Sequence, residues 1–290
     1  MLLASLLLLS SLAAQGQDTT FAATRGERLR LGVHEGSITV STWDRNAVRV
    51  QAEPEDDDDD ARLDISRSAG VISVSVRGRN GPPPEATFTL TVPAWMPLSL
   101  NSVEGDITVR GSAAAITAET VNGSVSVTGG VGNVSLSSVD GSVELSRASG
   151  NISVSTVNDD VTVRNSTGTV AASTVNGEVT LDAVTSSAVS VESVNGDVRF
   201  SGPIRNGGRY QLNTHNGDVT VGVQSGANVT VLVNTFSGDF STDIPVEIRT
   251  RKRQDGSFSF VLGDGSARLE LGSFQGSIQL MRPGQFRDQP

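Results

Sequence analysis

The sequence predicts an all-β protein built as a β-solenoid, and three observations support this fold class. A short phrase recurs at a nearly constant interval through the middle of the chain. Alternating apolar and polar residues follow each copy, and turn-forming residues separate the alternating runs. A period of this kind is typical of repeat architectures, in which each copy forms one unit stacked on the next.

The phrase reads Ser/Thr-Val-Asn-Gly, and its clearest copies begin at Thr120, Thr174 and Ser193. Its glycines lie at positions 105, 123, 141, 177, 196, 217 and 238, and Asp159 fills the slot between 141 and 177. The steps are therefore 18, 18, 18, 18, 19, 21 and 21 residues. Because Asn and Gly tolerate positive φ at little cost, we expect each copy to form a corner.

Apolar residues stand two and four positions after each glycine and alternate with polar ones, so one face of each strand should be buried. A second, weaker strand lies between successive glycines, as in Val134-Ser-Leu136. Each period thus holds two strands and two corners. The position two before the glycine carries Val or Phe in most copies, so we predict that it is buried and that His34 and His215 replace core residues there.

An antiparallel β meander is the alternative, because Asn-Gly between alternating strands is also a strong hairpin signal. Repetition of one slot pattern favours the solenoid, in which equivalent residues stack directly. Eight coils spaced ~4.8 Å apart would form a rod ~38 Å long, with two-strand coils of 18 to 21 residues.

The array needs caps at its open ends. We predict a signal peptide over 1–16, a β-rich N-terminal cap over 17–98, the regular array over 99–243, a C-terminal β cap over 244–281 and a tail over 282–290. An outlying copy spans 34–40, and a last copy around Gly276 is expected to close the rod. Asp255-Gly256 predicts a hairpin, and Asp56 to Asp60 a solvated loop.

Composition excludes several classes of protein. The net charge of −10 argues against a nucleic-acid partner, which requires clustered Lys and Arg. The absence of cysteine excludes disulfides, thiol catalysis and thiolate metal sites. The N-terminal apolar run is shorter than the ~20 residues that span a bilayer, so it predicts an export signal rather than a transmembrane segment. We expect a protein of the periplasm, the outer surface or the surrounding medium.

Residues suited to catalysis or to ligand binding are sparse, and we predict no catalytic or cofactor-binding residue. Stacked acidic residues that follow the corner glycine are weak calcium candidates, and solvated corner residues are the favoured interpretation. These candidates are Asp160, Glu178, Asp197, Asp218 and Asp239. Breaks in the repeat offer a ligand surface at Arg205, Arg209 and Tyr210, and in the N-terminal cap at Trp43 and Trp95.

One outward file of side chains is also expected, three positions after each glycine. It is rich in hydroxyl groups and interrupted by Glu144 and Arg199, and it reads Thr108, Ser126, Glu144, Thr162, Thr180, Arg199 and Thr220. Such a file could act as a flat recognition face.

With these residues in view, the chain resembles the bacterial adhesin-like family of β-strand-repeat proteins, a domain of unknown function related to the toastrack envelope domains. The resemblance covers roughly Arg28 to Leu280 and rests on the Ser/Thr-Val-Asn-Gly-x-Val-x-Val phrase and on the Val92-Pro93 entry to the array. It implies an exported β-solenoid with no established catalytic residues.

We therefore expect a non-enzymatic, exported, adhesin-like binding or structural protein that acts through its Ser/Thr-rich repeat face. Its partner would be a glycan or a protein of the envelope or cell surface. A polysaccharide-cleaving β-helix enzyme is the alternative, and it would need paired carboxylates. An envelope-stress sensing module is the second alternative.

Overall fold

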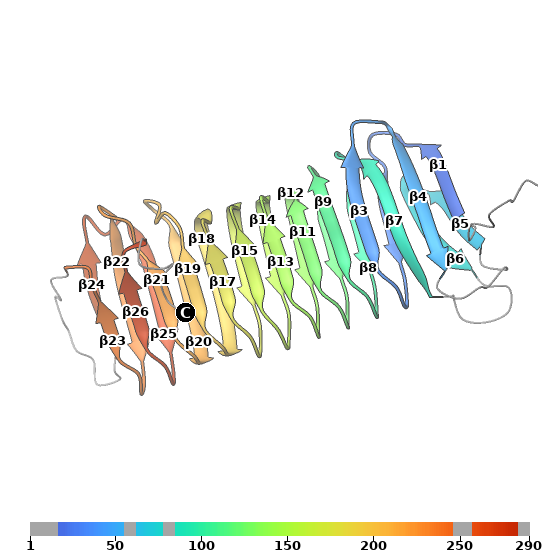
Figure 1. Cartoon of the computed structure of the whole chain (residues 1–290). Helices are drawn as coiled ribbons and strands as arrows, with labels where there is room; N and C mark the ends of the chain where they lie inside the picture. Colours follow the sequence, from blue (N-terminus) through green and yellow to red (C-terminus); the bar gives the residue numbers. More distant parts are fainter. Residues whose placement is uncertain (1–16, 55–61, 78–84, 246–256, 284–290) are drawn as a thin grey trace, which may run out of the picture.

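The computed structural model describes residues 17–54, 62–77, 85–245 and 257–283, and all 26 elements within these ranges are β-strands. They form a long rod of two facing sheets, with the strands stacked side by side along the rod (Figure 1). Neighbouring strands are parallel throughout the regular array. The predicted β-solenoid is therefore confirmed, and the antiparallel meander is excluded for the array.

Each sheet contains 13 strands, and their spatial order differs from their order in the sequence. Sheet A runs β1 (Gln17–Ala22), β4 (Ala47–Pro54), β7 (Ala86–Pro93), β3 (Ile38–Trp43), β9 (Ile107–Ser112), β11 (Val125–Gly129), β13 (Val143–Ser146), β15 (Val161–Arg164), β17 (Val179–Asp182), β19 (Val198–Ser201), β21 (Val219–Gly222), β26 (Ile278–Met281) and β23 (Phe240–Thr242). Sheet B runs β24 (Ser257–Leu262), β22 (Val229–Thr235), β25 (Ala267–Ser273), β20 (Arg209–Asn216), β18 (Thr185–Asn195), β16 (Thr167–Ser173), β14 (Ser149–Ser155), β12 (Val131–Ser137), β10 (Ile116–Glu119), β8 (Leu98–Asn101), β2 (Arg28–Gly32), β6 (Val71–Arg77) and β5 (Arg62–Ser68).

Equivalent residues of successive coils stack directly, as the 18-residue period predicts. In sheet A, for example, Val125 pairs with Val143 and Val143 pairs with Val161. The inward positions of both sheets are fully buried Val, Ile and Leu, which interdigitate in a narrow core. A core of aliphatic residues fits the close approach of two flat sheets, and it explains why so few aromatic residues are needed.

At both ends the coils are not stacked in the order of the sequence. The coil of β2 and β3 packs directly on that of β8 and β9, so the copy around Gly36 belongs to the array and is not an outlier. The coil of β25 and β26 lies between those of β20–β21 and β22–β23. The prediction that the copy around Gly276 closes the rod is therefore wrong, because β22, β23 and β24 lie beyond it.

The Asn-Gly corner, where each strand of sheet B passes into sheet A, requires glycine for close stacking as well as for the positive φ that Gly105, Gly123, Gly141 and Gly196 adopt. At Gly217 the φ angle lies outside the left-handed region, yet an added Cβ would lie 2.6 Å from the Gly196 carbonyl carbon. Successive coils therefore approach each other too closely at this corner for any side chain. At Asp159, the one exception, the β-bridges that link neighbouring corners, such as that between Asn122 and Asp140, are interrupted.

The Ser or Thr that opens the phrase points inward and stabilises the same corner. Thr120 Oγ1 donates to the Gly105 carbonyl over 3.1 Å, and Thr174 Oγ1 donates to the Asp159 carbonyl over 2.9 Å. The same bond recurs at Ser102, Ser138, Thr156, Ser193, Thr214 and Ser273. A hydroxyl ladder thus ties each corner to the coil before it.

Candidate functional site

The outer face of sheet A is a flat polar surface that follows the rod. The file predicted to point outward is in register from coil to coil, as Ser126 pairs with Glu144 and Thr162 with Thr180. A second outward file runs beside it, in which the hydroxyls of Thr128 and Ser146 lie 3.1 Å apart. Thr220 is the exception in the first file, because it is 6% exposed. We name this surface the hydroxyl face.

Exposed arginines border the hydroxyl face at the opposite corner, where the strands of sheet A end. Arg110 and Arg164 lie at or near the ends of β9 and β15, and Arg147 follows β13. Arg110 and Arg147 flank a hollow of about 500 Å³ whose other lining residues are Gly111, Ser112, Thr128 and Gly129. Among the residues that the structure describes, these three arginines form no ion pair. We name them the basic edge.

The acidic file after the corner glycine has a structural role in the corners. The carboxylate of Asp160 accepts the Glu178 backbone N–H over 2.7 Å, and that of Asp197 accepts the Asp218 N–H over 2.9 Å. Arg199 lies 3.5 Å from the Glu178 carboxylate and 3.7 Å from the Asp197 carboxylate, which reduces repulsion along the file.

Two calcium candidates are not neighbours. The Asp218 carboxylate accepts the N–H of Ser277 in the interposed coil, which separates Asp218 from Asp239. In the described part of the chain, no three His, Asp or Glu side chains are grouped as metal ligands. The calcium site stays a prediction that metal titration would test.

Tyr210 does not belong to a ligand surface, so this prediction is wrong. Its side chain is 1% exposed and packs against Phe200 at a ring distance of 5.6 Å. Its hydroxyl donates to the Ser186 carbonyl over 2.6 Å and accepts the Arg205 backbone N–H over 2.9 Å. Burial raises the pKa of Tyr210 above its ordinary value of 10.0. The tyrosine anchors the 203–208 loop, whereas the side chains of Arg205 and Arg209 are exposed.

The two tryptophans lie together at the N-terminal end of the rod. Trp43 Nε1 donates to the Ala47 carbonyl over 2.7 Å, and Trp95 Nε1 donates to the Asn46 side chain over 3.2 Å. Arginines cover both rings, Arg45 at 5.2 Å and Arg25 at 5.5 Å. The tryptophans lie about six coils, or roughly 29 Å, from the 203–208 loop, so the structure does not join the two predicted ligand surfaces.

The position two before the corner glycine is exposed, which overturns the prediction that it is buried. His34 and His215 are exposed, so neither replaces a core residue. Five of the six valines at this position are 36% to 43% exposed, Val103 is half-buried, and Phe236 is 75% exposed. The parity of the strand would have signalled this: Val139 stands three residues after the inward Leu136, whereas Ser138 stands two after it and is buried.

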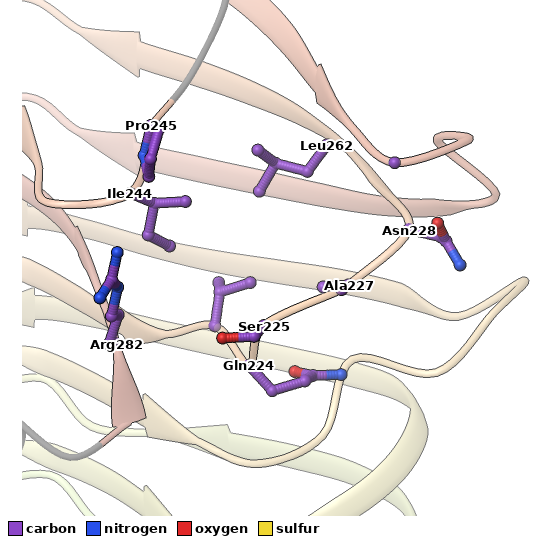
Figure 2. A pocket seen from close by; sticks show the side chains of 11 residues that line it. Gln224, Ser225, Ala227, Asn228, Ile244, Pro245, Leu262 and Arg282 are labelled. Carbon is purple, nitrogen blue, oxygen red and sulfur yellow. The ribbon is translucent and has the colours of Figure 1, made fainter.

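A cavity of about 310 Å³ lies at the C-terminal end (Figure 2). Its apolar lining includes Ile244, Pro245 and Leu262, and Gln224 and Arg282 contribute polar groups. Gln224 exchanges two hydrogen bonds with the backbone of Ile204, each 3.0 Å long, which fixes one wall. Residues 246–256, which include the predicted Asp255-Gly256 hairpin, follow directly after Pro245 and lie outside the described residues.

The predicted signal peptide over 1–16 and the acidic loop at Asp56 to Asp60 also lie outside the described residues. Within the described ranges, no helical segment has the length and hydropathy needed to cross a membrane.

Comparison with known proteins gives a family and distant structural likenesses. The profile of the family described as Toastrack DUF4097 matches residues 24–281, and a search of curated proteins found no match. A "putative adhesin" from Bacteroides fragilis is 10% identical over 92% of this chain and 98% of its own, with a TM-score of 0.41. A "putative lipid binding protein" from Parabacteroides distasonis is 11% identical over 91% and 96%, with a TM-score of 0.35. A "putative cell adhesion protein" from Clostridium sporogenes is 9% identical over 92% and 100%, with a TM-score of 0.25.

Proposed function

Because the chain belongs to the Toastrack DUF4097 family, we propose that it is an exported, non-enzymatic, adhesin-like protein that binds an extended glycan along the hydroxyl face. The observation that carries this proposal is the hydroxyl face itself, with its two outward files in register from coil to coil. Hydroxyl groups recur along the two files at the coil spacing of ~4.8 Å and supply donors and acceptors. They belong to Thr108, Ser126, Thr128, Ser146, Thr162, Thr180 and Ser201, and the charged residues Arg110, Glu144, Arg164, Asp182 and Arg199 hold the other positions of these coils.

A long polymer would use this face through many weak contacts. Each hydroxyl contributes little by itself, but contacts along one polymer are made at a high effective concentration and therefore reinforce each other. The basic edge favours an anionic glycan, because Arg110, Arg147 and Arg164 are free to pair with carboxylate or sulfate groups. The repeated face needs no single deep pocket for this mode of binding.

Retention of the full chain on immobilised polygalacturonate, with dextran as a neutral comparison, tests the proposal. The variant Ser126→Glu/Thr162→Glu/Thr180→Glu places three carboxylates on the hydroxyl face and should lower retention at least tenfold. The control Ser135→Glu/Ser153→Glu/Ser190→Glu adds the same charge to exposed positions of sheet B and should retain the polymer as the wild type does.

Equal loss in both triple variants would show that net charge, and not the hydroxyl face, decides retention. Release of reducing ends from the polymer would instead support the polysaccharide-cleaving alternative. Export is tested separately: the full chain expressed in a bacterium should leave the cytoplasm, and a chain that lacks residues 1–16 should not.

A further inference from the structure

A row of side chains, mostly exposed and apolar, follows the Asn-Gly corner along the whole array, with a histidine at two positions and the partly exposed Val103 at a third. We name this row the ridge, and its members occupy the position two before each corner glycine. In spatial order they are His34, Val103, Val121, Val139, Val157, Val175, Val194, His215, Phe274 and Phe236.

The ridge is rigid because its backbone is hydrogen-bonded from coil to coil. The residue after each ridge position donates its N–H to the ridge carbonyl of the preceding coil, as Asp140 does to Val121 over 2.8 Å. At the C-terminal end, the Phe274 ring stacks on His215 and on Phe236, with 4.7 Å between centroids and 4° between planes in both pairs. Nine steps of ~4.8 Å make the ridge roughly 43 Å long.

The exposed apolar area of the ridge is of the size of a functional surface patch. At about two-fifths exposure each of the five central valines offers on the order of 50 Å², and Phe236 and Phe274 together offer about 200 Å², or roughly 450 Å² in all. Apolar patches on monomers reach about 300–600 Å² and are often functional at that size. A standard interface buries about 800 Å² per partner, so the apolar side chains of the ridge supply roughly half of that area and the polar rows beside it would supply the rest.

The period of the ridge identifies the kind of partner. Side chains on one face of an extended strand repeat every ~6.7 Å, so a strand laid along the ridge would fall out of step within a few residues. A second stack of β-coils has the same ~4.8 Å spacing and stays in step over the full length. We infer that the ridge pairs with the ridge of a second copy of this chain, in an antiparallel, two-fold symmetric dimer.

Charges beside the ridge favour the antiparallel direction. The residues that directly follow each ridge residue in the sequence form a neighbouring row. Its acids, Glu35, Glu104 and Asp140, all lie in the N-terminal half of the rod, and its C-terminal half is neutral. Antiparallel overlap of the full ridges brings each of these acids opposite Gln, Ser or Asn of the second copy. A further row is formed by the residues that directly follow each corner glycine. In the antiparallel overlap its only facing acids are Asp160 of one copy and Glu178 of the other, and Arg199 lies beside Glu178.

The antiparallel overlap places Val157 opposite Val175, and Val139 opposite Val194. It also covers Phe236, the most exposed large apolar side chain among the described residues, with the N-terminal end of the second ridge. Like-charged contacts are costly across an interface, and this register leaves only the one between Asp160 and Glu178 in the two rows.

Sedimentation equilibrium of the full chain tests the dimer. The wild type should dimerise at micromolar concentration or below, and Val157→Asp/Val175→Asp should weaken dimerisation at least 100-fold by crowding four carboxylates at the two-fold axis. The control Val131→Asp/Val261→Asp changes two valines that are 49% and 47% exposed but lie off the ridge. It should dimerise like the wild type, and circular dichroism should show both variants folded.

Cysteine pairing tests the direction, since the wild type contains no cysteine. An oxidised mixture of Val139→Cys and Val194→Cys chains should yield a covalent dimer that neither variant forms alone. Covalent dimers of Val139→Cys alone would overturn the antiparallel register. A monomeric wild type at 100 μM, or a ridge variant that dimerises as well as the control, would overturn the interface. Glycan retention through the hydroxyl face is measured independently and does not depend on these outcomes.

Discussion

Substitution of a corner glycine by alanine should destabilise the rod far more than glycine-to-alanine changes usually do. At Gly123 the new Cβ would lie 2.6 Å from the Gly105 carbonyl carbon and 3.2 Å from the Asp106 nitrogen. Contacts below 3.0 Å essentially never occur for real Cβ atoms, and both neighbours are backbone atoms that cannot rotate away. The coils must therefore separate locally.

The cost follows from the hydrogen bonds that hold this corner. Gly123 N–H donates to the Asp140 carbonyl over 2.9 Å, Gly105 N–H donates to the Asn122 carbonyl over 2.8 Å, and the Ser124 N–H donates to Asp106 over 2.7 Å. Loss of two or three such bonds, at about 1 kcal/mol each, predicts that Gly123→Ala lowers the free energy of unfolding by about 2–3 kcal/mol.

Urea denaturation gives the magnitude, and amide hydrogen exchange gives the location. Exchange of the Gly105 and Gly123 amides should accelerate, while that of strands several coils away should change little. The control is Gly32→Ala, because a Cβ at this position of β2 meets no atom within 4 Å. Gly32→Ala should change stability by less than about 1 kcal/mol. If Gly123→Ala unfolds at the same urea concentration as Gly32→Ala, close stacking is not what selects glycine at the corner.

Three further substitutions test other parts of the rod. Asp159→Gly should raise the free energy of unfolding by up to about 1 kcal/mol, since two restored corner hydrogen bonds outweigh the entropic cost of glycine; an unchanged urea midpoint would contradict this. Thr174→Val should cost about 1–2 kcal/mol by removing the 2.9 Å bond to the Asp159 carbonyl, whereas the outward Thr162→Val should cost little in the same urea titration. Tyr210→Phe should cost about 1–3 kcal/mol through loss of the 2.6 Å bond to Ser186. Because the folded pKa of Tyr210 lies above its ordinary value of 10.0, the tyrosine contributes stability below pH 10 that is lost as pH rises through the folded pKa. The wild type should therefore lose stability above pH 10 more steeply than Tyr210→Phe does.

The prediction that the ridge residues are buried is wrong because it extended the alternation of the strand after the corner back through the corner. Counted back from Val143 and the glycine at 141, Val139 has the parity of a core position. Counted forward from Leu136 in β12, it has the parity of an exposed one, and the structure follows the second count. The chain changes direction at the corner, so side-chain parity is kept along a strand but not through the turn that ends it.

The sequence by itself determined the repeating coil. Its period, the alternation of Val with Ser or Thr, and the phrase at each corner are local properties, and direct stacking of identical positions satisfies all of them at once. The family resemblance rested on the same residues and is confirmed by the family match. The first outward file of the hydroxyl face depends on the same alternation, which is why its residues could be named in advance, whereas the second file was not predicted.

The tertiary structure alone decided which coils are neighbours and what each corner tolerates. Strand pairing depends on which sheet edge is free, so β25 and β26 fill a gap between coils that precede them in the sequence. The burial of Tyr210 depends on the 203–208 loop folding back over it, and the corner glycines on a carbonyl contributed by another coil. Each of these features depends on contacts between residues that are distant in sequence. A periodic pattern describes only what is the same in every coil, so it does not predict such contacts.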